Sequence, residues 1–174
     1  GATHASCAAH PELAARSFVV SSFGKTYHIT GWKVGYILAP RELMAEFRKV
    51  HQFNVFTVNT PVQLALADYM ADASRHLGLA AFYQGKRDFF RDAMAGSRFE
   101  LLPSRGTYFQ LARYGAISDM ADAAFCEHLT RNVGVAAIPV SAFFADGRDE
   151  RVIRLCLAKN ENTLAAACER LCRI

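Results

Sequence analysis

The sequence lacks several features that would place it in a specialised class of proteins. Its longest apolar stretch, residues 133–145, is too short to cross a bilayer and contains Pro139. No signal peptide is visible, and the cationic residues are dispersed rather than gathered into a run suited to a phosphate backbone. We therefore expect neither a membrane protein nor a nucleic-acid-binding protein.

The cysteines give no sign of a disulfide framework or a metal site. There are five, an odd number, and none belongs to a Cys-x-x-Cys pair. Cys168 and Cys172 are four residues apart on a predicted helix, where they lie on one apolar face. Buried, reduced thiols in a cytoplasmic protein explain this usage best. Because His28 and His51 lack metal-ligand spacing, we expect no metal.

The sequence also has no initiator Met, since it begins Gly-Ala-Thr-His. Its composition is that of an ordinary globular protein, with 174 residues, 52% hydrophobic and 21% charged residues, and a net charge of +4. This length suits one large domain or one and a half small ones. We expect a polypeptide that begins in the middle of a longer protein.

Hydrophobic periodicity in the first part of the chain predicts strands followed by helices. The runs 17–23 and 33–38 resemble strands, and Pro40 opens a helix. Thr60, at the cap position, starts a helix that continues to about residue 71. A longer helix over about 75–95 follows, with its cations, Arg87 among them, turned outward.

From Phe99 onward, short strands alternate with helices. Asp119 is expected to cap one helix and Asn160 the last one. Taken together, the pattern predicts an α/β fold in two domains, residues 1–73 and 74–174, with the long helix connecting them. The expected strands of the second part span residues 99–102, 107–112, 135–140 and 152–158.

Lys25 is the residue that most strongly suggests chemistry. It stands in a Gly-flanked turn between the two predicted strands, with Ser22 three residues before it and Lys33 eight residues after it. A rigidly held lysine that is partly stripped of water can act as a Schiff-base nucleophile. A hydroxyl on one side and an ammonium on the other could both bind a phosphate.

Two other interpretations of Gly24-Lys25-Thr26 compete with this one. A nucleotide-binding phosphate loop needs a glycine where Val19 stands, and a helix that begins at the lysine. The residues that follow Lys25 are instead β-branched and aromatic, and a glycine interrupts them. The second alternative is that Lys25 and Lys33 are ordinary surface lysines in a turn.

The segment 22–36, Ser-Phe-Gly-Lys-Thr-Tyr-His-Ile-Thr-Gly-Trp-Lys-Val-Gly-Tyr, resembles the pyridoxal-phosphate attachment segment of class I/II aminotransferases. It is most similar to the branch that includes the methionine, kynurenine and glutamine-phenylpyruvate aminotransferases. Three further blocks agree in order, and the resemblance covers nearly the whole chain. These blocks are residues 58–63, 106–109 and 153–159.

The resemblance implies a role for several residues. Lys25 would be the catalytic Schiff-base lysine, and Ser22 and Lys33 would bind the phosphate of pyridoxal 5'-phosphate. Lys33 replaces an arginine that is more usual in the family, so a fork of donors is lost and the charge is kept. Arg154 would bind the α-carboxylate of the substrate. Val140 stands where the family favours glycine.

Arg154 also attracts attention on physical grounds, because it lies in an apolar strand where an unpaired guanidinium is costly to bury. A carboxylate partner would remove that cost, although a solvent-exposed strand face is an equal alternative. Tyr108, in Gly-Thr-Tyr-Phe, is either a wall of the substrate pocket or a core residue. Asn59 either reaches toward the site of a partner subunit or packs at the entry of a helix.

The resemblance implies the C-terminal part of a fold type I, pyridoxal-phosphate-dependent aminotransferase. Its substrates would be an amino acid, of the methionine or aromatic type, and a 2-oxo acid, and the full-length protein would be a cytoplasmic homodimer. The family residues that stack on and protonate the cofactor ring precede the lysine and have no counterpart here, so the 174 residues alone should turn over little. A carbon–sulfur β-lyase and a non-catalytic dimerisation fragment remain as alternatives.

Overall fold

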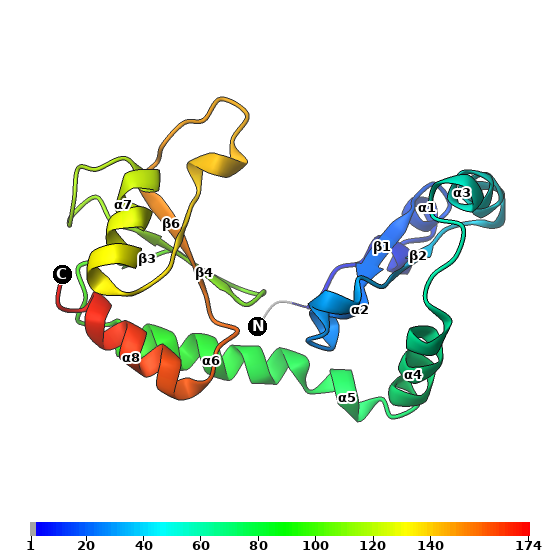
Figure 1. Ribbon diagram of the computed structural model, residues 1–174, viewed down its shortest axis with the longest axis horizontal. Helices are drawn as coiled ribbons and strands as arrows, with labels where there is room; N and C mark the ends of the chain where they lie inside the picture. The colour runs from blue at the N-terminus through cyan, green and yellow to red at the C-terminus, as the bar shows by residue number, and fades with distance from the viewer. Residues whose placement is uncertain (1–2) are drawn as a thin grey trace. The chain divides into compact units, whose positions relative to one another are not determined.

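The apolar run before Lys25 forms strand β1 (Val19–Ser22), and the run after it forms β2 (Gly35–Leu38). Both strands belong to a computed structural model that describes residues 3–174 (Figure 1). They are shorter than predicted and pair antiparallel, with Ser22 opposite Gly35. Residues 1 and 2, with which the first predicted domain begins, lie outside the described residues.

The connection between β1 and β2 is helical, where a strand-borne turn was expected. Helix α2 (Phe23–Thr26) is a single turn that contains Lys25, and the 3₁₀ turn η2 (Thr30–Trp32) follows it. The amide of Tyr27 donates to the carbonyl of Phe23, which closes the helical turn at 2.9 Å. The strand prediction for Phe23 and the strand-borne position of Lys25 were therefore wrong.

Three further helices follow in the same unit. Asn59, and not Thr60, caps α4: its side-chain oxygen accepts a hydrogen bond from the amide of Val62 at 3.2 Å. The predicted helix after Pro40 is confirmed, with Pro40 at its cap position. The helices and turns of this unit outside the lysine turn are η1 (Cys7–Ala9), α1 (Pro11–Ala14), α3 (Arg41–Asn54), α4 (Thr60–Met70) and α5 (Ser74–Leu77).

The chain divides into two compact units, one up to Leu79 and one from Ala80 to Ile174. The predicted helix over 75–95 is interrupted at Gly78, so that α5 ends before it and α6 (Leu79–Ala93) begins after it. Glycine disfavours the helix interior because it loses the most backbone freedom on folding. The boundary between the two units falls at the start of α6.

The second unit contains an antiparallel sheet with strand order β3-β4-β6-β5. Leu111 of β4 pairs with Arg154 of β6, and Ile138 of β5 also pairs with Arg154. Four strands were expected here, and four are found with shorter bounds. They are β3 (Glu100–Leu101), β4 (Phe109–Arg113), β5 (Ile138–Pro139) and β6 (Val152–Cys156).

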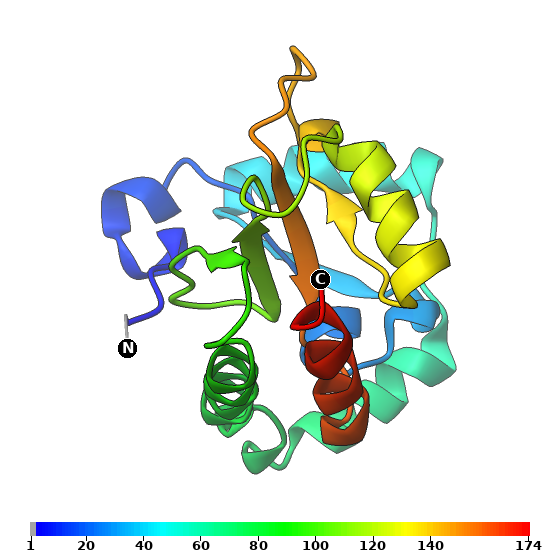
Figure 2. The same cartoon turned by 90° about the vertical axis from the view of Figure 1, so that its left-hand side faces the viewer.

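The helices of this unit share one apolar core with one face of the sheet (Figure 2). Phe90 of α6, Phe125 of α7 and Leu164 of α8 join Ile153 and Leu155 of β6 in this core. Asn160 caps α8 through a 2.8 Å bond from the Thr163 amide, as predicted. The remaining elements are α7 (Asp122–His128), the π-helical turn η3 (Leu129–Val133), the 3₁₀ turn η4 (Ser141–Phe143) and α8 (Glu161–Leu171).

Three expectations about side chains in this unit were wrong. Asp119 does not cap α7, whose first residue, Asp122, instead donates its amide to the Asp149 carboxylate at 2.8 Å. Arg87 is buried, with 5% of its surface exposed, although the helical pattern turned it outward. Cys172 is exposed, whereas its predicted partner on the apolar face, Cys168, is buried.

Within residues 3–174, no helix has both the length and the apolar character that a membrane crossing requires. The same residues contain no group of three or more His, Cys, Asp or Glu side chains arranged to hold a metal ion.

Candidate active site

Lys25 lies on the one-turn helix α2, directly after β1, and its side chain is exposed within this unit. The expected removal of water from this lysine is therefore not found among the described residues. Gly24, beside it, is buried because the chain folds back closely at this point. A Cβ on Gly24 would lie 3.0 Å from the Cα of Thr30 and 3.3 Å from the Oγ of Ser22.

Ser22 and Lys33 lie on the two sides of the same turn. The hydroxyl of Ser22 approaches Gly24, the neighbour of Lys25. Lys33 adopts φ of 55°, in the left-handed region, as does His28 with φ of 58°. Non-glycine residues rarely adopt this conformation, and such residues gather at functional sites. The structure thus brings Ser22 and Lys25 together at one end of the β1–β2 pair, with Lys33 at the entry to β2.

Arg154 lies on the face of the sheet opposite the helices. Its neighbours in β6, Ile153 and Leu155, point into the core, and successive strand residues point to opposite faces. Leu111 and Ile138, which pair with Arg154, share its face and are 37% and 42% exposed. The arginine is therefore surrounded by an apolar surface that no helix of this unit covers.

Two aromatic rings contact the guanidinium group of Arg154. Its Cζ lies 4.1 Å from the ring centre of Phe109 and 4.7 Å from that of Phe143. Its Nε is buried and has no hydrogen-bond partner among the described residues. A buried donor without a partner is costly, and a guanidinium presents its donors as a fork that suits a carboxylate. A carboxylate is chemically suited to pair with a guanidinium in this arrangement.

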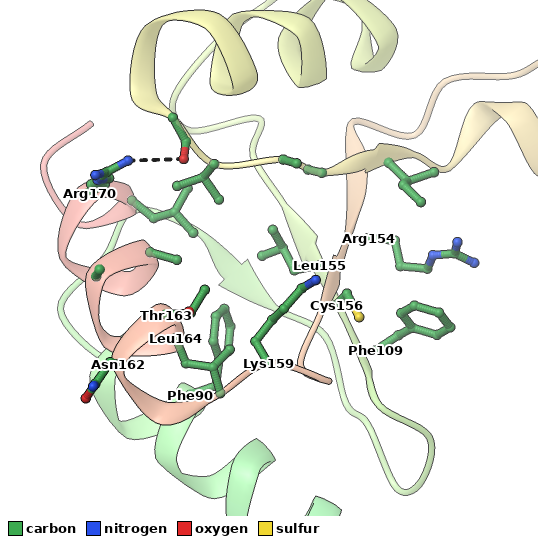
Figure 3. A pocket seen from close by; sticks show the side chains of 18 residues that line it. Phe90, Phe109, Arg154, Leu155, Cys156, Lys159, Asn162, Thr163, Leu164 and Arg170 are labelled. Atoms are coloured by element: carbon green, nitrogen blue, oxygen red, sulfur yellow. Dashed lines mark hydrogen bonds between the residues drawn. The ribbon is translucent and has the colours of Figure 1, made fainter. Parts of the chain in front are cut away.

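A cavity of about 650 Å³ adjoins Arg154 (Figure 3). Its walls are mostly apolar and come from α8, residues 134–138 and β6. Figure 3 shows Arg154 and Phe109 on one side of β6, with Leu155 on the other. The charged lining residues within the described chain are all cationic: Arg154, Lys159 and Arg170. An apolar ligand with a negative charge suits such a cavity.

Tyr108 and Asn59, for which the sequence left two interpretations each, both make contacts within this chain. The ring of Tyr108 packs on Tyr83, with centres 5.6 Å apart, and on Phe109, with centres 4.5 Å apart. Burial raises the pKa of the Tyr83 phenol, and Tyr108 raises it further. Asn59 caps α4, as described above. Val140, where the family favours glycine, has φ of −81° and is unstrained.

Sequence reasoning missed the two rings that contact Arg154. Phe109 is next to Tyr108 in a block that the resemblance singled out, but the register that places it opposite Cys156, near Arg154, is a tertiary property. Phe143 follows Val140 by three residues in the loop between β5 and β6. No spacing rule connects either residue with Arg154 in advance of the fold.

Comparison with protein families gives one clear match. The family model for aminotransferases of class I and II matches residues 2–171. Among curated proteins, methionine aminotransferase of Escherichia coli is 56% identical over 97% of this chain. Kynurenine–oxoglutarate transaminase 1 of Mus musculus is 30% identical over 99% of it. The chain spans only 44% and 46% of the lengths of these two relatives.

Solved structures confirm the fold class. An Escherichia coli protein with a methionine aminotransferase function superimposes with a TM-score of 0.95 and 55% identity. The match covers 98% of this chain and 46% of that protein. N-succinyldiaminopimelate aminotransferase of Mycobacterium tuberculosis has a TM-score of 0.83 and 33% identity over 95% of this chain and 44% of its own.

Proposed function

Because this chain belongs to the class I and II aminotransferases, we propose that it functions in the transfer of an amino group from an amino acid to a 2-oxo acid. The observation that carries the proposal is Arg154, whose buried Nε has no hydrogen-bond partner in residues 3–174, while two rings contact its guanidinium. An amino-acid substrate supplies a carboxylate for this fork of donors.

We propose pyridoxal 5'-phosphate as the cofactor, attached through Lys25. The residues of the lysine turn fit such a group. The backbone packs closely at Gly24, where a Cβ would crowd the Cα of Thr30 at 3.0 Å, and the Ser22 hydroxyl is directed toward the turn. Ser22 and Lys33 offer a hydroxyl donor and a cation for a phosphate. When bound, the cofactor supplies a conjugated ring that delocalises the electrons left on the substrate Cα.

Some residues of the chain would then bind the substrate and the cofactor, and one would transfer a proton. Arg154 would bind the α-carboxylate and so orient the amino acid. Lys25, as a free amine, would move a proton between the substrate Cα and the C4′ atom of the cofactor. Ser22 and Lys33 would hold the phosphate throughout.

We propose methionine or an aromatic amino acid as the donor. The similarity to the Escherichia coli methionine aminotransferase, at 56% identity, supports this choice.

We also propose that the complete protein is a cytoplasmic homodimer. Several large apolar side chains of the first unit are exposed, including Phe53 at 87% and Phe56 at 77%. Exposed apolar groups of this kind commonly mark surfaces that another chain covers.

Borohydride trapping tests the proposed function. The complete protein, as it occurs in the cell, is loaded with pyridoxal phosphate, reduced and digested, and the modified peptide is identified by mass spectrometry. We expect the label on Lys25 and its loss in Lys25→Ala, with Lys49→Ala as the matched control. Lys49 is exposed and pairs with Glu46 at 2.7 Å. A label on another lysine would contradict the proposal.

Product analysis then separates the reactions. Transamination predicts a 2-oxo acid that retains the carbon skeleton of the donor. A β-lyase would instead release pyruvate and ammonia from a cystathionine-like substrate.

A further inference from the structure

Asp122 carries a buried carboxylate in a part of the second unit that the proposed reaction does not use. Its side chain is at the start of α7, and only 2% of the residue is exposed. The carboxylate accepts hydrogen bonds from the amide of Ser141 at 2.8 Å and from the hydroxyl of Ser141 at 2.7 Å. These two bonds compensate for the burial of the charge.

Ser141 is the first residue of η4, and Phe143 is the last. A 3₁₀ turn of three residues is too short to be stable by itself, so its position depends on its anchor. The ring of Phe143 is not fixed by burial, because the residue is 60% exposed. The position of the ring therefore depends on the anchor at Asp122, together with the backbone of Val140, whose amide donates to the Val152 carbonyl of β6 at 3.2 Å.

The ring of Phe143 is one of the two that contact the guanidinium of Arg154, at 4.7 Å. A second tie reinforces the arrangement: Asp149, later in the same loop, accepts a hydrogen bond from the amide of Asp122 at 2.8 Å. The loop from Ser141 to Asp149 is thus attached to the start of α7 at both ends. A continuous set of contacts runs from Asp122 through Ser141 and Phe143 to Arg154.

We propose that Asp122 is a positioning residue for the carboxylate site at Arg154. By fixing Phe143, it holds the plane of the guanidinium in one orientation. Two parallel hydrogen bonds to a carboxylate require that orientation, whereas a single bond does not. This inference rests on the proposed function, because it requires Arg154 to be the carboxylate-binding residue.

The test uses the complete, cofactor-loaded protein and two probes, hydrocinnamate and its primary amide. The variants are Asp122→Asn, Ser141→Ala, their combination, and Phe143→Leu. Asp119→Asn is the matched control. Asp119 is an exposed aspartate near the start of the same helix, and its carboxylate pairs with Arg151 at 2.7 Å. Dissociation constants of both probes, KM and kcat for the amino donor, and Tm are measured.

We expect Asp122→Asn to weaken hydrocinnamate binding and raise KM about tenfold, the usual consequence of one lost buried hydrogen bond. kcat and amide binding should change less than about twofold. Phe143→Leu should act in the same direction. The combined variant should be no weaker than Asp122→Asn alone, since both residues act through one turn. Asp119→Asn should leave every value unchanged.

Equal weakening of both probes, or a fall in Tm with carboxylate binding intact, would overturn the inference, because Asp122 would then have only a structural role. If Asp122→Asn does not fold, Phe143→Leu and Ser141→Ala decide the question by the same criteria. Arg154→Ala distinguishes a failure of the proposed function from a failure of the inference about Asp122. If it retains carboxylate binding, the proposed function fails, and if it loses that binding while Asp122→Asn retains it, only the inference fails.

Discussion

Gly35 lies opposite Ser22 and next to Ser21 so closely that a Cβ on Gly35 would come within 2.5 Å of the Ser21 carbonyl oxygen. Any side chain at this position must push β1 and β2 apart, and these two strands frame the lysine turn. Gly31, four residues earlier, has open space around its own Cβ position.

We therefore predict that Gly35→Ala lowers the free energy of unfolding by about 1–3 kcal/mol, whereas Gly31→Ala changes it by less than about 0.5 kcal/mol. Denaturant unfolding of both variants measures the difference. If the two variants have equal stability, the close approach of the strands does not matter energetically.

Arg154→Lys should reduce kcat/KM for the amino donor about a hundredfold, because an ammonium cannot make two parallel hydrogen bonds to a carboxylate. Arg148→Lys is the control: Arg148 also stacks on a ring, that of Phe144 at 3.7 Å, but it already pairs with Asp146 and Glu150. In steady-state kinetics, kcat/KM of this control should stay near the wild-type value. A similar loss in both variants would contradict the special role of Arg154.

Arg87→Ala should destabilise the second unit by about 2 kcal/mol. The buried guanidinium donates to the Thr107 carbonyl at 2.6 Å and to the Gln84 side chain at 2.8 Å. Without the guanidinium, the turn at Thr107, where φ is 62°, loses the hydrogen bond to its carbonyl. Arg91→Ala, at an exposed position one turn along the same helix, should have little effect. Thermal unfolding of the two variants compares the two positions directly.

Burial raises the pKa of the Cys126 and Cys168 thiols from an ordinary value of 9.0 to about 11. Between these two values the folded protein keeps protons that the unfolded chain releases. The contribution of these two thiols to the free energy of unfolding is therefore complete below pH 9, and it is lost as the pH rises toward 11. Unfolding curves across this range should show decreasing stability, with a smaller decrease in Cys126→Ala.

Alkylation checks the same two thiols chemically. At pH 9, iodoacetamide should modify the exposed Cys7, Cys156 and Cys172 in the folded protein and spare Cys126 and Cys168. All five should react after unfolding. Rapid modification of Cys126 in the folded state would contradict the burial of its thiol.

Local signals predicted most of the elements because they act within a few residues. Asn160, for instance, caps α8 through a bond to Thr163, three residues away. Thr60 was predicted as the cap of α4, but the residue before it, Asn59, occupies the cap position. Lys25 was placed on a strand-borne turn because apolar and small residues precede it, but the backbone makes a helical turn instead.

Long-range partners explain the remaining errors. A charged helical residue is expected to face solvent, but Arg87 is held inside by the carbonyl of Thr107, 20 residues away. Asp122 is held by Ser141, 19 residues away. Neither partner belongs to a local motif, so helical periodicity cannot indicate them. The rings at Arg154 depend likewise on strand register and loop anchoring.

The position of Cys156 has a practical consequence. It follows Arg154 by two residues, so both point to the same face of β6, and both line the same cavity. Once the other exposed cysteines, Cys7 and Cys172, are replaced, a fluorescent reporter on this thiol would signal the filling of the arginine site.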